Sequence, residues 1–330
     1  MNKNCIFCGK PPQNKNKEHI LPKWLIKLTG MEKKQVSVGT DLVTGKEYTF
    51  NLLNFTFPAC TQCNTDFAAV EAAVKPVMEK LLADDYVVEE ELTLLLDWFD
   101  KVRLAMHIAL HYQNNKNFQL DPKYYINNRV GIKDRFLSVT NTYDGSIGMS
   151  WTGVSTYAFL RSPNCFTLRI NHMIFVNCSL DFLISEQVGF PYPAWQVENK
   201  LTGRSDMPLL SGKGKVANRI FKTPLYAPQT IICQPLFGIA KAAMPEKYDN
   251  DYVRSHALDF EKGRGKLFIF KDNECFVLDR EEELTCAGDG KRRRYLFNRP
   301  TLTLQLEIMR SVRYNLAAYT PEDRVGLLKS

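Results

Sequence analysis

The chain has 330 residues, of which 45% are hydrophobic and 24% are charged, and its formal net charge is +7 at pH 7. This composition excludes an intrinsically disordered chain and is typical of a globular protein with room for two domains. The charge permits a polyanionic partner but is too modest for this length to require one. The positions of the basic residues therefore matter more than their total.

Nine cysteines are present, which is an odd number, and four of them form regular pairs. Scattered thiols without a pattern are typical of a reducing compartment. The first five residues lack the apolar core of a secretion signal, and no later stretch is long and apolar enough to cross a bilayer. We therefore expect a cytoplasmic protein that does not associate with membranes.

The N-terminal part of the chain is predicted to contain several short elements. A short helix is expected to begin at Pro22, because a helix tolerates proline in its first turn. Two strands are expected at 36–39 and 46–53, where β-branched and aromatic residues flank a turn at Gly45. We interpret residues 1–84 as one N-terminal module.

Two long helices are predicted next. From Asn64 the apolar residues recur at three- and four-residue spacing, which indicates a helix that Pro76 should kink or divide. A second helix is expected from about Glu89 to Gln113, with acidic residues in its first turn, where the helix dipole favours negative charge. We interpret residues 85–125 as a helical connector.

Residues 126–330 have the pattern of an α+β domain with a mostly antiparallel sheet. Short runs rich in β-branched and aromatic residues alternate with turn residues and predict strands at 136–141, 155–160, 166–170, 172–178, 230–233, 266–271 and 274–278. Helices are expected near 238–244 and from about Thr301 to Tyr314. We expect this domain to bind substrate, to sense a signal or to mediate assembly. Assembly would involve a protein partner or a second copy of the chain.

The paired cysteines predict a metal site. Cys5 and Cys8 form one Cys-x-x-Cys turn, and Cys60 and Cys63 form the other. Four thiolates at this spacing suit one tetrahedral Zn²⁺ that joins the two ends of the segment. A zinc ribbon without catalysis is one interpretation. A redox pair is less well supported, because neither turn lies in a βαβ pattern.

Three residues near the cysteines have the chemistry that phosphodiester hydrolysis needs. His19 can accept a proton from water near neutral pH, and Glu18 and Asn64 offer oxygen ligands for Mg²⁺ or Mn²⁺. A zinc ion between the two turns would bring Asn64 close to His19. Glu71 lies seven residues after Asn64 on the same helix face. It is a further candidate to bind the metal ion directly or to contact one of its ligands.

These residues carry a resemblance to a known family. Cys5-x-x-Cys8, Glu18-His19-Ile20-x-Pro22-x-Trp24-Leu25, Cys60-x-x-Cys63-Asn64 and Glu71 resemble the HNH endonucleases, also called ββα-metal or His-Me finger nucleases. The resemblance covers about residues 5–71. It implies an α+β protein with an N-terminal zinc-bound ββα-metal module, in which His19 is the general base, Glu18 and Asn64 hold a catalytic Mg²⁺ or Mn²⁺, and the four cysteines hold a structural zinc.

The resemblance also implies a substrate and products. We expect a DNA endonuclease, with DNA favoured over RNA, that leaves 5′-phosphate and 3′-hydroxyl ends and serves as a regulated nuclease of a bacterial defence or mobile-element system. The chain departs from the family pattern where a middle asparagine usually stands, because Phe55 occupies that position and Asn54 lies one place away. A noncatalytic zinc-ribbon protein that binds nucleic acid is the alternative.

Several of these residues have other interpretations. Asn64 is also a suitable helix N-cap, and Glu71 is also typical of a solvated helix face. His107 and His111 have the spacing of a metal-binding pair, but without a neighbouring acidic motif they favour a helix surface or interface. Basic residues in two clusters are candidates for phosphate contacts: Lys213, Lys215, Arg292, Arg293 and Arg294.

Overall fold

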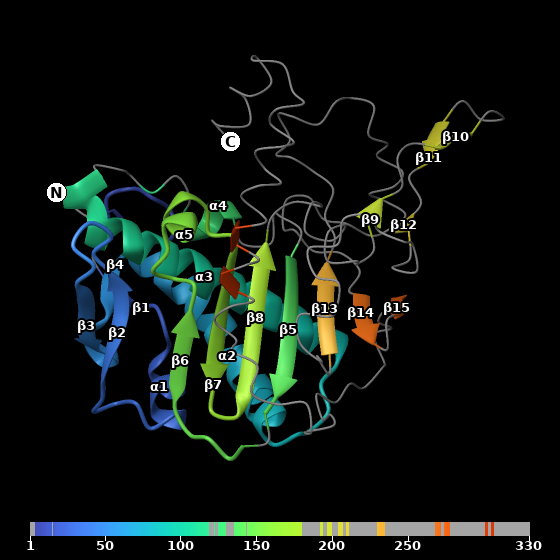
Figure 1. Ribbon diagram of the computed structural model, residues 1–330, viewed down its shortest axis with the longest axis horizontal. Coiled ribbons are helices and arrows are strands. Elements are labelled where there is room, and N and C mark those ends of the chain that lie inside the picture. Colours follow the sequence, from blue (N-terminus) through green and yellow to red (C-terminus); the bar gives the residue numbers. More distant parts are fainter. Residues whose placement is uncertain are drawn as a thin grey trace.

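A computed structural model describes residues 4–14, 16–118, 122, 125–129, 135–142, 144–179, 192–193, 197–199, 204–206, 209–210, 230–234, 268–271, 274–277, 301–302 and 305–306. Within these residues the protein is α+β with antiparallel sheets, which confirms the predicted class (Figure 1). The predicted helix at 238–244 lies outside the described residues. Of the predicted helix at 301–314, the four described residues are helical.

The N-terminal segment is built around a two-stranded sheet. Strand β1 (Asn16–His19) pairs antiparallel with β4 (Thr56–Ala59). Between them lie α1 (Lys23–Leu28), the hairpin of β2 (Gln35–Thr40) and β3 (Glu47–Asn51), and the 3-10 turn η1 (Leu52–Asn54). The hairpin confirms the two predicted strands.

Two long helices follow this segment. Helix α2 (Thr61–Leu82) begins three residues earlier than predicted, and Pro76 lies inside it without dividing it. Helix α3 (Glu89–Phe118) carries the predicted acidic first turn and extends beyond the predicted end. In the described part of the chain, no helix is both long enough and apolar enough to span a membrane.

A seven-stranded antiparallel sheet forms the larger part of the fold. Its order is β15-β14-β13-β5-β8-β7-β6. The strands are β5 (Arg135–Asn141), β6 (Met149–Thr152), β7 (Cys165–Ile170), β8 (Met173–Ser179), β13 (Thr230–Gln234), β14 (Phe268–Lys271) and β15 (Glu274–Val277). The small pairs β9 (Tyr192–Pro193) with β12 (Leu209–Leu210) and β10 (Val197–Asn199) with β11 (Arg204–Asp206) are separate from it. Every residue of β8 is buried, so both faces of the sheet are covered at its centre.

The prediction of a strand at 155–160 is wrong, because this stretch forms helix α5 (Tyr157–Arg161). The Thr156 side chain caps the helix by accepting a hydrogen bond from the backbone N–H of Phe159 at 3.1 Å. A short apolar run is compatible with either a buried strand or one buried helical turn, and the Thr156 cap stabilises the helical turn. A second short helix, α4 (Ile126–Arg129), follows α3.

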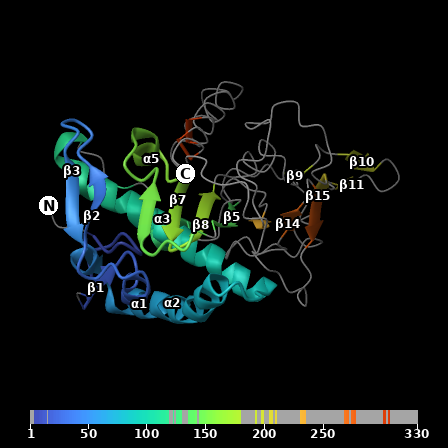
Figure 2. The ribbon, with the colours of Figure 1, turned by 60° about the horizontal axis from the view of Figure 1, so that its bottom comes forward.

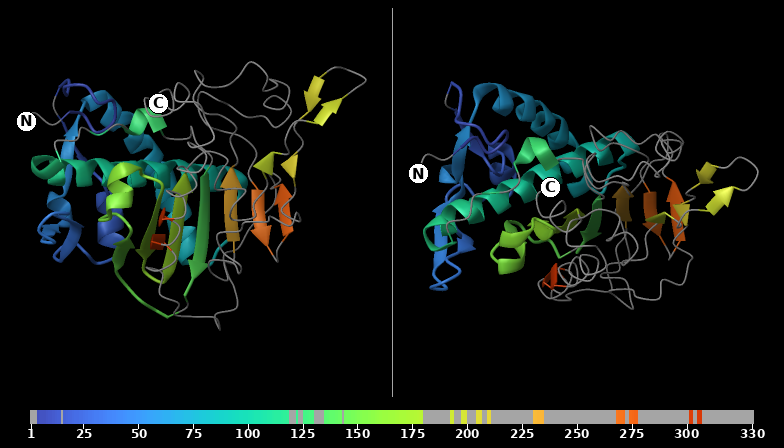
Figure 3. Two further views of the ribbon diagram at one scale, coloured as in Figure 1. Left: turned by 45° about the horizontal axis from the view of Figure 1, so that its top comes forward. Right: turned by 90° about the horizontal axis from the view of Figure 1, so that it is seen from above.

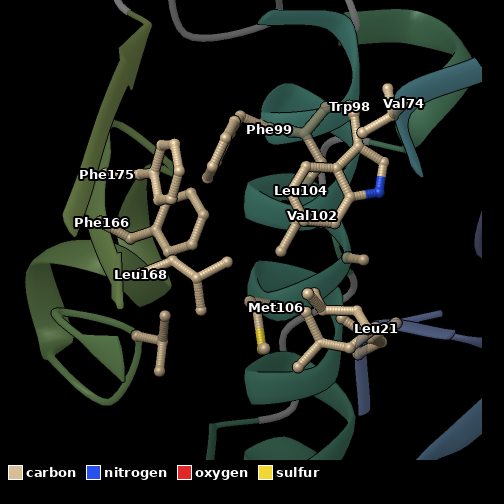
Figure 4. Close-up of a cluster of buried hydrophobic side chains, with 14 of the residues drawn as sticks. Leu21, Val74, Trp98, Phe99, Val102, Leu104, Met106, Phe166, Leu168 and Phe175 are labelled. Atoms are coloured by element: carbon tan, nitrogen blue, oxygen red, sulfur yellow. The ribbon is translucent and has the colours of Figure 1, made fainter. Parts of the chain in front are cut away.

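Helix α3 lies between the sheet and the N-terminal segment. Figure 2 shows it crossing one face of the sheet, with α1 and α2 on its far side, and Figure 3 shows the same order from two other directions. Phe99 packs against Phe175 on β8 with ring centroids 4.9 Å apart, and Trp98 lies on the opposite side of α3, near Val74 of α2 (Figure 4). One hydrophobic core therefore joins all three layers, and α3 can place side chains in two directions.

Candidate active site and metal centre

The four paired cysteines come together. Their Sγ atoms all lie within 4.8 Å of one another, and the Sγ atoms of Cys8 and Cys60 are 3.9 Å apart. In a tetrahedral site with Zn–S bonds of about 2.3 Å, neighbouring sulfurs are about 3.8 Å apart. The cluster therefore has the composition and spacing to hold a metal ion such as zinc.

The ionisation of the thiols also fits a cation at this point. Burial raises the pKa of the Cys5 thiol, but backbone hydrogen bonds from Cys8, Cys60 and Phe7 outweigh it and leave that pKa below its ordinary value. Burial and the negative charge of the neighbouring sulfurs raise the pKa of Cys63 to about 12. A bound cation would relieve this repulsion and allow all four sulfurs to ionise together.

The turn that holds Cys5 and Cys8 is fixed by its backbone. Gly9 donates its N–H to the carbonyl of Cys5 at 2.9 Å and has a φ of +74°, a conformation that side chains disfavour. A Cβ at this position would lie 2.6 Å from the ring of Tyr125. Glycine is therefore required at position 9 by both conformation and space.

His19 ends strand β1 and lies opposite Thr56 of β4. Its ring is half-buried, and Nε2 lies 3.1 Å from the carbonyl oxygen of Leu53. Because a carbonyl can only accept, this contact assigns the hydrogen to Nε2 and leaves Nδ1 as the basic nitrogen of the neutral ring. Burial, assisted by the positive charges of Lys23 and Lys101, lowers the pKa of His19 below its ordinary value.

The turn that supports His19 depends on a residue that the sequence did not identify. Asn51 caps η1 by accepting the N–H of Leu53 at 2.9 Å, and its side-chain amide donates to the carbonyl of Glu32 at 2.9 Å. Asn51 therefore stabilises the turn that contains Leu53, whose carbonyl group contacts His19. An asparagine just before a short turn is a recognisable capping signal, although its tertiary role is not encoded locally.

Glu18 lies in a buried cluster of charges. The ammonium of Lys101, in the middle of α3, contacts Glu18 Oε1 and lies 2.6 Å from Oε1 of Glu71 on α2. It also lies 3.3 Å from the carbonyl oxygen of His19 and 3.5 Å from that of Ile20. One ammonium therefore joins β1, α2 and α3.

This cluster has more negative than positive charge. Burial lowers the pKa of Lys101, but Glu71 and Glu18 outweigh it and raise that pKa above its ordinary value, so the ammonium stays charged. Burial and the charge of Glu71 raise the pKa of Glu18, and the attraction of Lys101 does not fully compensate. Two carboxylates against one ammonium leave a net charge of −1 when all three groups are ionised, which favours a further cation nearby.

Asn64 is the fourth residue of α2, and its N–H donates to the carbonyl of Cys60 at 3.0 Å. The interpretation of Asn64 as an N-cap is therefore wrong, because Cys60 occupies that position. Its half-buried side chain has no hydrogen-bond partner among the residues that the structure describes. The amide oxygen thus remains available as a ligand, one turn from Cys60 and two turns before Glu71.

Sequence reasoning missed Lys101, although a signal was present. Helix α3 has apolar residues on every side, including Trp98, Phe99, Val102 and Leu104, all with no exposed area. A helix that is apolar all round is buried, and a charged residue within it must then be paired. The pattern therefore indicated a buried ion pair without indicating its partners.

The candidate histidine pair and the candidate phosphate-binding residues lie away from Glu18 and His19 or outside the described residues. His107 and His111 are buried between α3 and α5, where His107 Nδ1 lies 2.7 Å from the carbonyl oxygen of Phe159 and His111 Nε2 lies 2.9 Å from that of Leu160. They form a helix interface, as expected. The basic residues Lys213, Lys215, Arg292, Arg293 and Arg294 lie outside the described residues.

Comparisons with protein-family models, with curated proteins and with solved structures found no match to this chain. The functional assignment consequently rests on the chemistry of the site itself. That site combines a four-cysteine cluster, a half-buried histidine with a lowered pKa, and carboxylate and amide oxygens on the adjoining strand and helix.

Proposed function

We propose that the protein is a metal-dependent endonuclease of the HNH type that hydrolyses phosphodiester bonds of DNA. The observation that supports this most directly is the position of His19. The ring is half-buried at the end of β1, held by the Leu53 carbonyl, and flanked by Glu18 on the same strand. Strand β1, its partner β4 and helix α2 have the order of the ββα unit in the resembled family, and the cysteine cluster links the chain before β1 to the start of α2.

In this proposal His19 is the general base. Its lowered pKa keeps the ring neutral near pH 7, and Nδ1 accepts the proton of the attacking water. The Leu53 carbonyl fixes the tautomer and favours the imidazolium that forms, because the Nε2–H bond to a carbonyl strengthens when the ring gains charge. A general base of this kind contributes about 10²- to 10⁴-fold to the rate.

Glu18 and Asn64 would hold Mg²⁺ or Mn²⁺. When bound, such an ion stabilises the negative charge that develops on the phosphoryl and leaving oxygens. The donor set fits, because carboxylate and amide oxygens are suitable ligands for these ions, and because the Glu18 cluster carries excess negative charge. Oε2 of Glu18 also has no hydrogen-bond partner among the described residues.

The wider biological role is proposed on the resemblance alone. It suggests cleavage that leaves 5′-phosphate and 3′-hydroxyl ends, and a regulated nuclease of a bacterial defence or mobile-element system. The sheet domain would then recognise the substrate, sense a signal or mediate assembly. Cleavage products with the opposite end chemistry, identified by ligation and end-labelling, would contradict the first of these expectations.

Plasmid cleavage tests the proposed activity. The full-length protein is assayed with Mg²⁺ or Mn²⁺ beside His19→Ala and the matched control His172→Ala, which alters a half-buried histidine of the β7–β8 turn. We expect His19→Ala to lose about 10²- to 10⁴-fold of the rate and His172→Ala to keep it. Zinc content should be equal in all three proteins. Equal cleavage by parent and His19→Ala, or no cleavage by the parent, would contradict the proposal.

A noncatalytic zinc-ribbon protein that binds nucleic acid is the second candidate. One observation favours it, namely that Glu18 pairs with Lys101 and so has a structural role that does not require catalysis. Such a protein would bind DNA equally well with His19 or alanine at position 19, and neither form would cleave it. Measured binding together with cleavage therefore separates the two functions.

A further inference from the structure

Lys101 reaches the candidate active site from outside the N-terminal segment. It lies on α3, its side chain has no exposed area, and its ammonium contacts four oxygens. Two of these belong to carboxylates, of Glu18 and Glu71, and two are the backbone carbonyls of His19 and Ile20. Both candidate catalytic residues of β1 therefore contact the same buried cation, Glu18 through its side chain and His19 through its backbone.

The cluster lies beside a second buried ion network on the same helix. One residue before Lys101, Asp100 contacts Arg103 at 2.7 Å and Arg135 at 3.0 Å, and Arg135 also contacts Asp97 at 2.6 Å. The Lys101 cluster sets one ammonium against two carboxylates. A buried excess of negative charge is unfavourable by itself but suits a site that takes up another cation.

We propose that Lys101 is a positioning residue of the active site, holding Oε1 of Glu18 so that Oε2 serves as the ligand of the catalytic ion. This inference rests on the proposed function. Metal-binding carboxylates are commonly oriented by a hydrogen bond to a neighbouring group, and loss of that group lowers metal affinity by about 10- to 100-fold. Contacts with the carbonyls of His19 and Ile20 hold the strand end in the same way. The nuclease site is thus completed by α3, which also packs on the sheet.

A competing interpretation predicts the opposite change in metal affinity when Lys101 is removed. If the ammonium occupied the position of the catalytic ion, its removal would open a site with two carboxylates, and divalent cations would bind more tightly. If Lys101 only tied α3 to the N-terminal segment, a folded variant without it would bind the ion as the parent does. Metal affinity therefore distinguishes positioning from both alternatives.

The test uses Mn²⁺ titration of the full-length, zinc-loaded protein, followed by electron paramagnetic resonance of the free ion. The main variant is Lys101→Met/Glu71→Gln, which removes one positive and one negative charge and so keeps the net charge of −1. Its Mn²⁺ affinity is compared with that of Glu71→Gln alone, which loses the same carboxylate but keeps the ammonium on Glu18. A lower affinity in the double variant, despite its more negative charge, then reports the loss of orientation. Lys80→Met is the control, because it removes an ion pair of 2.6 Å between α2 and α3, with Glu91, away from the site.

We expect Mn²⁺ affinity to fall about 10- to 100-fold in the double variant, relative to Glu71→Gln alone, and to stay unchanged in Lys80→Met. Zinc content and thermal unfolding verify that each protein is folded. If the double variant fails to fold, Lys101→Gln/Glu71→Gln replaces it. That variant has the same net charge and keeps a neutral donor, and we expect its affinity to fall less, by a few-fold.

The outcomes separate this inference from the proposed function. Glu18→Gln shows whether Mn²⁺ binds at Glu18. If it does, and the double variant binds Mn²⁺ as tightly as Glu71→Gln alone or more tightly, the positioning role of Lys101 is wrong while the nuclease proposal stands. If the parent does not bind Mn²⁺, or binds it with an affinity that Glu18→Gln leaves unchanged, the metal site of the proposed function is wrong and the inference fails with it.

Discussion

Lys101→Met removes the ammonium group that lies between the carboxylates of Glu18 and Glu71. The Lys101 side chain is 0% exposed, that of Glu18 is 7% exposed and that of Glu71 is 17% exposed, so water cannot replace the lost contacts effectively. Removal of one partner from a buried ion pair lowers the free energy of unfolding by about 3–5 kcal/mol. We expect a loss in that range for Lys101→Met near neutral pH.

The same substitution at Lys80 provides a matched comparison. Lys80 pairs with Glu91 between the same two helices, but its side chain is 40% exposed. Exposed pairs contribute about 0–1 kcal/mol, because water and salt screen them. Urea unfolding of both variants, with zinc present and tryptophan fluorescence as the signal, measures the two free energies. Equal losses in the two variants would refute the assignment of Lys101 as a buried, paired cation.

The effect of Lys101→Met should also depend on pH. Glu18 has a pKa above its ordinary value in the folded protein, so its ionisation opposes folding, and stability falls as pH rises through the folded pKa. Without the ammonium that pKa rises further. We therefore expect a larger loss at about pH 8 than at about pH 5.5. Glu71→Gln in the same chain should recover part of the loss, since one carboxylate remains where two were adjacent.

Three further predictions concern the site and the core. Because the pKa of His19 is lowered, kcat/KM for cleavage should rise with pH through a value below the ordinary pKa of histidine; a rise centred above that ordinary value would contradict the assignment. Cys63→Ser should lower zinc content, thermal stability and cleavage together, and retention of stoichiometric zinc by metal analysis would argue against the four-cysteine site. Phe99→Ala removes ring contacts with Phe166 and Phe175 and should lower the free energy of unfolding by about 3–5 kcal/mol in urea, with zinc content unchanged; a loss below about 1 kcal/mol would contradict its place in the core.

Elements with local signals were predictable from the sequence. Apolar spacing indicated α2 and α3, alternating β-branched and aromatic residues indicated the β2–β3 hairpin, and the two Cys-x-x-Cys turns indicated a shared metal site. Each of these signals extends over a few residues or follows a fixed spacing. Such patterns reflect backbone geometry that the chain adopts in any compact fold.

Where two local structures suit the same residues, the sequence was ambiguous. The stretch 155–160 has the composition of a strand but forms α5, because Thr156 caps a single helical turn whose apolar residues are buried. Asn64 suits an N-cap, yet α2 begins earlier, at the second cysteine turn. In both cases the packing of surrounding elements selected one of two structures with similar local preferences.

Long-range packing determined which groups meet at the candidate active site. Lys101 contacts Glu18 from 83 positions away and Glu71 from 30 positions away. The sequence showed a lysine within an apolar helix and two separate glutamates, and no local rule pairs them. Their contact follows from the packing of α3 against β1 and α2, where burial requires each charge to find a partner among the groups that the fold brings within reach.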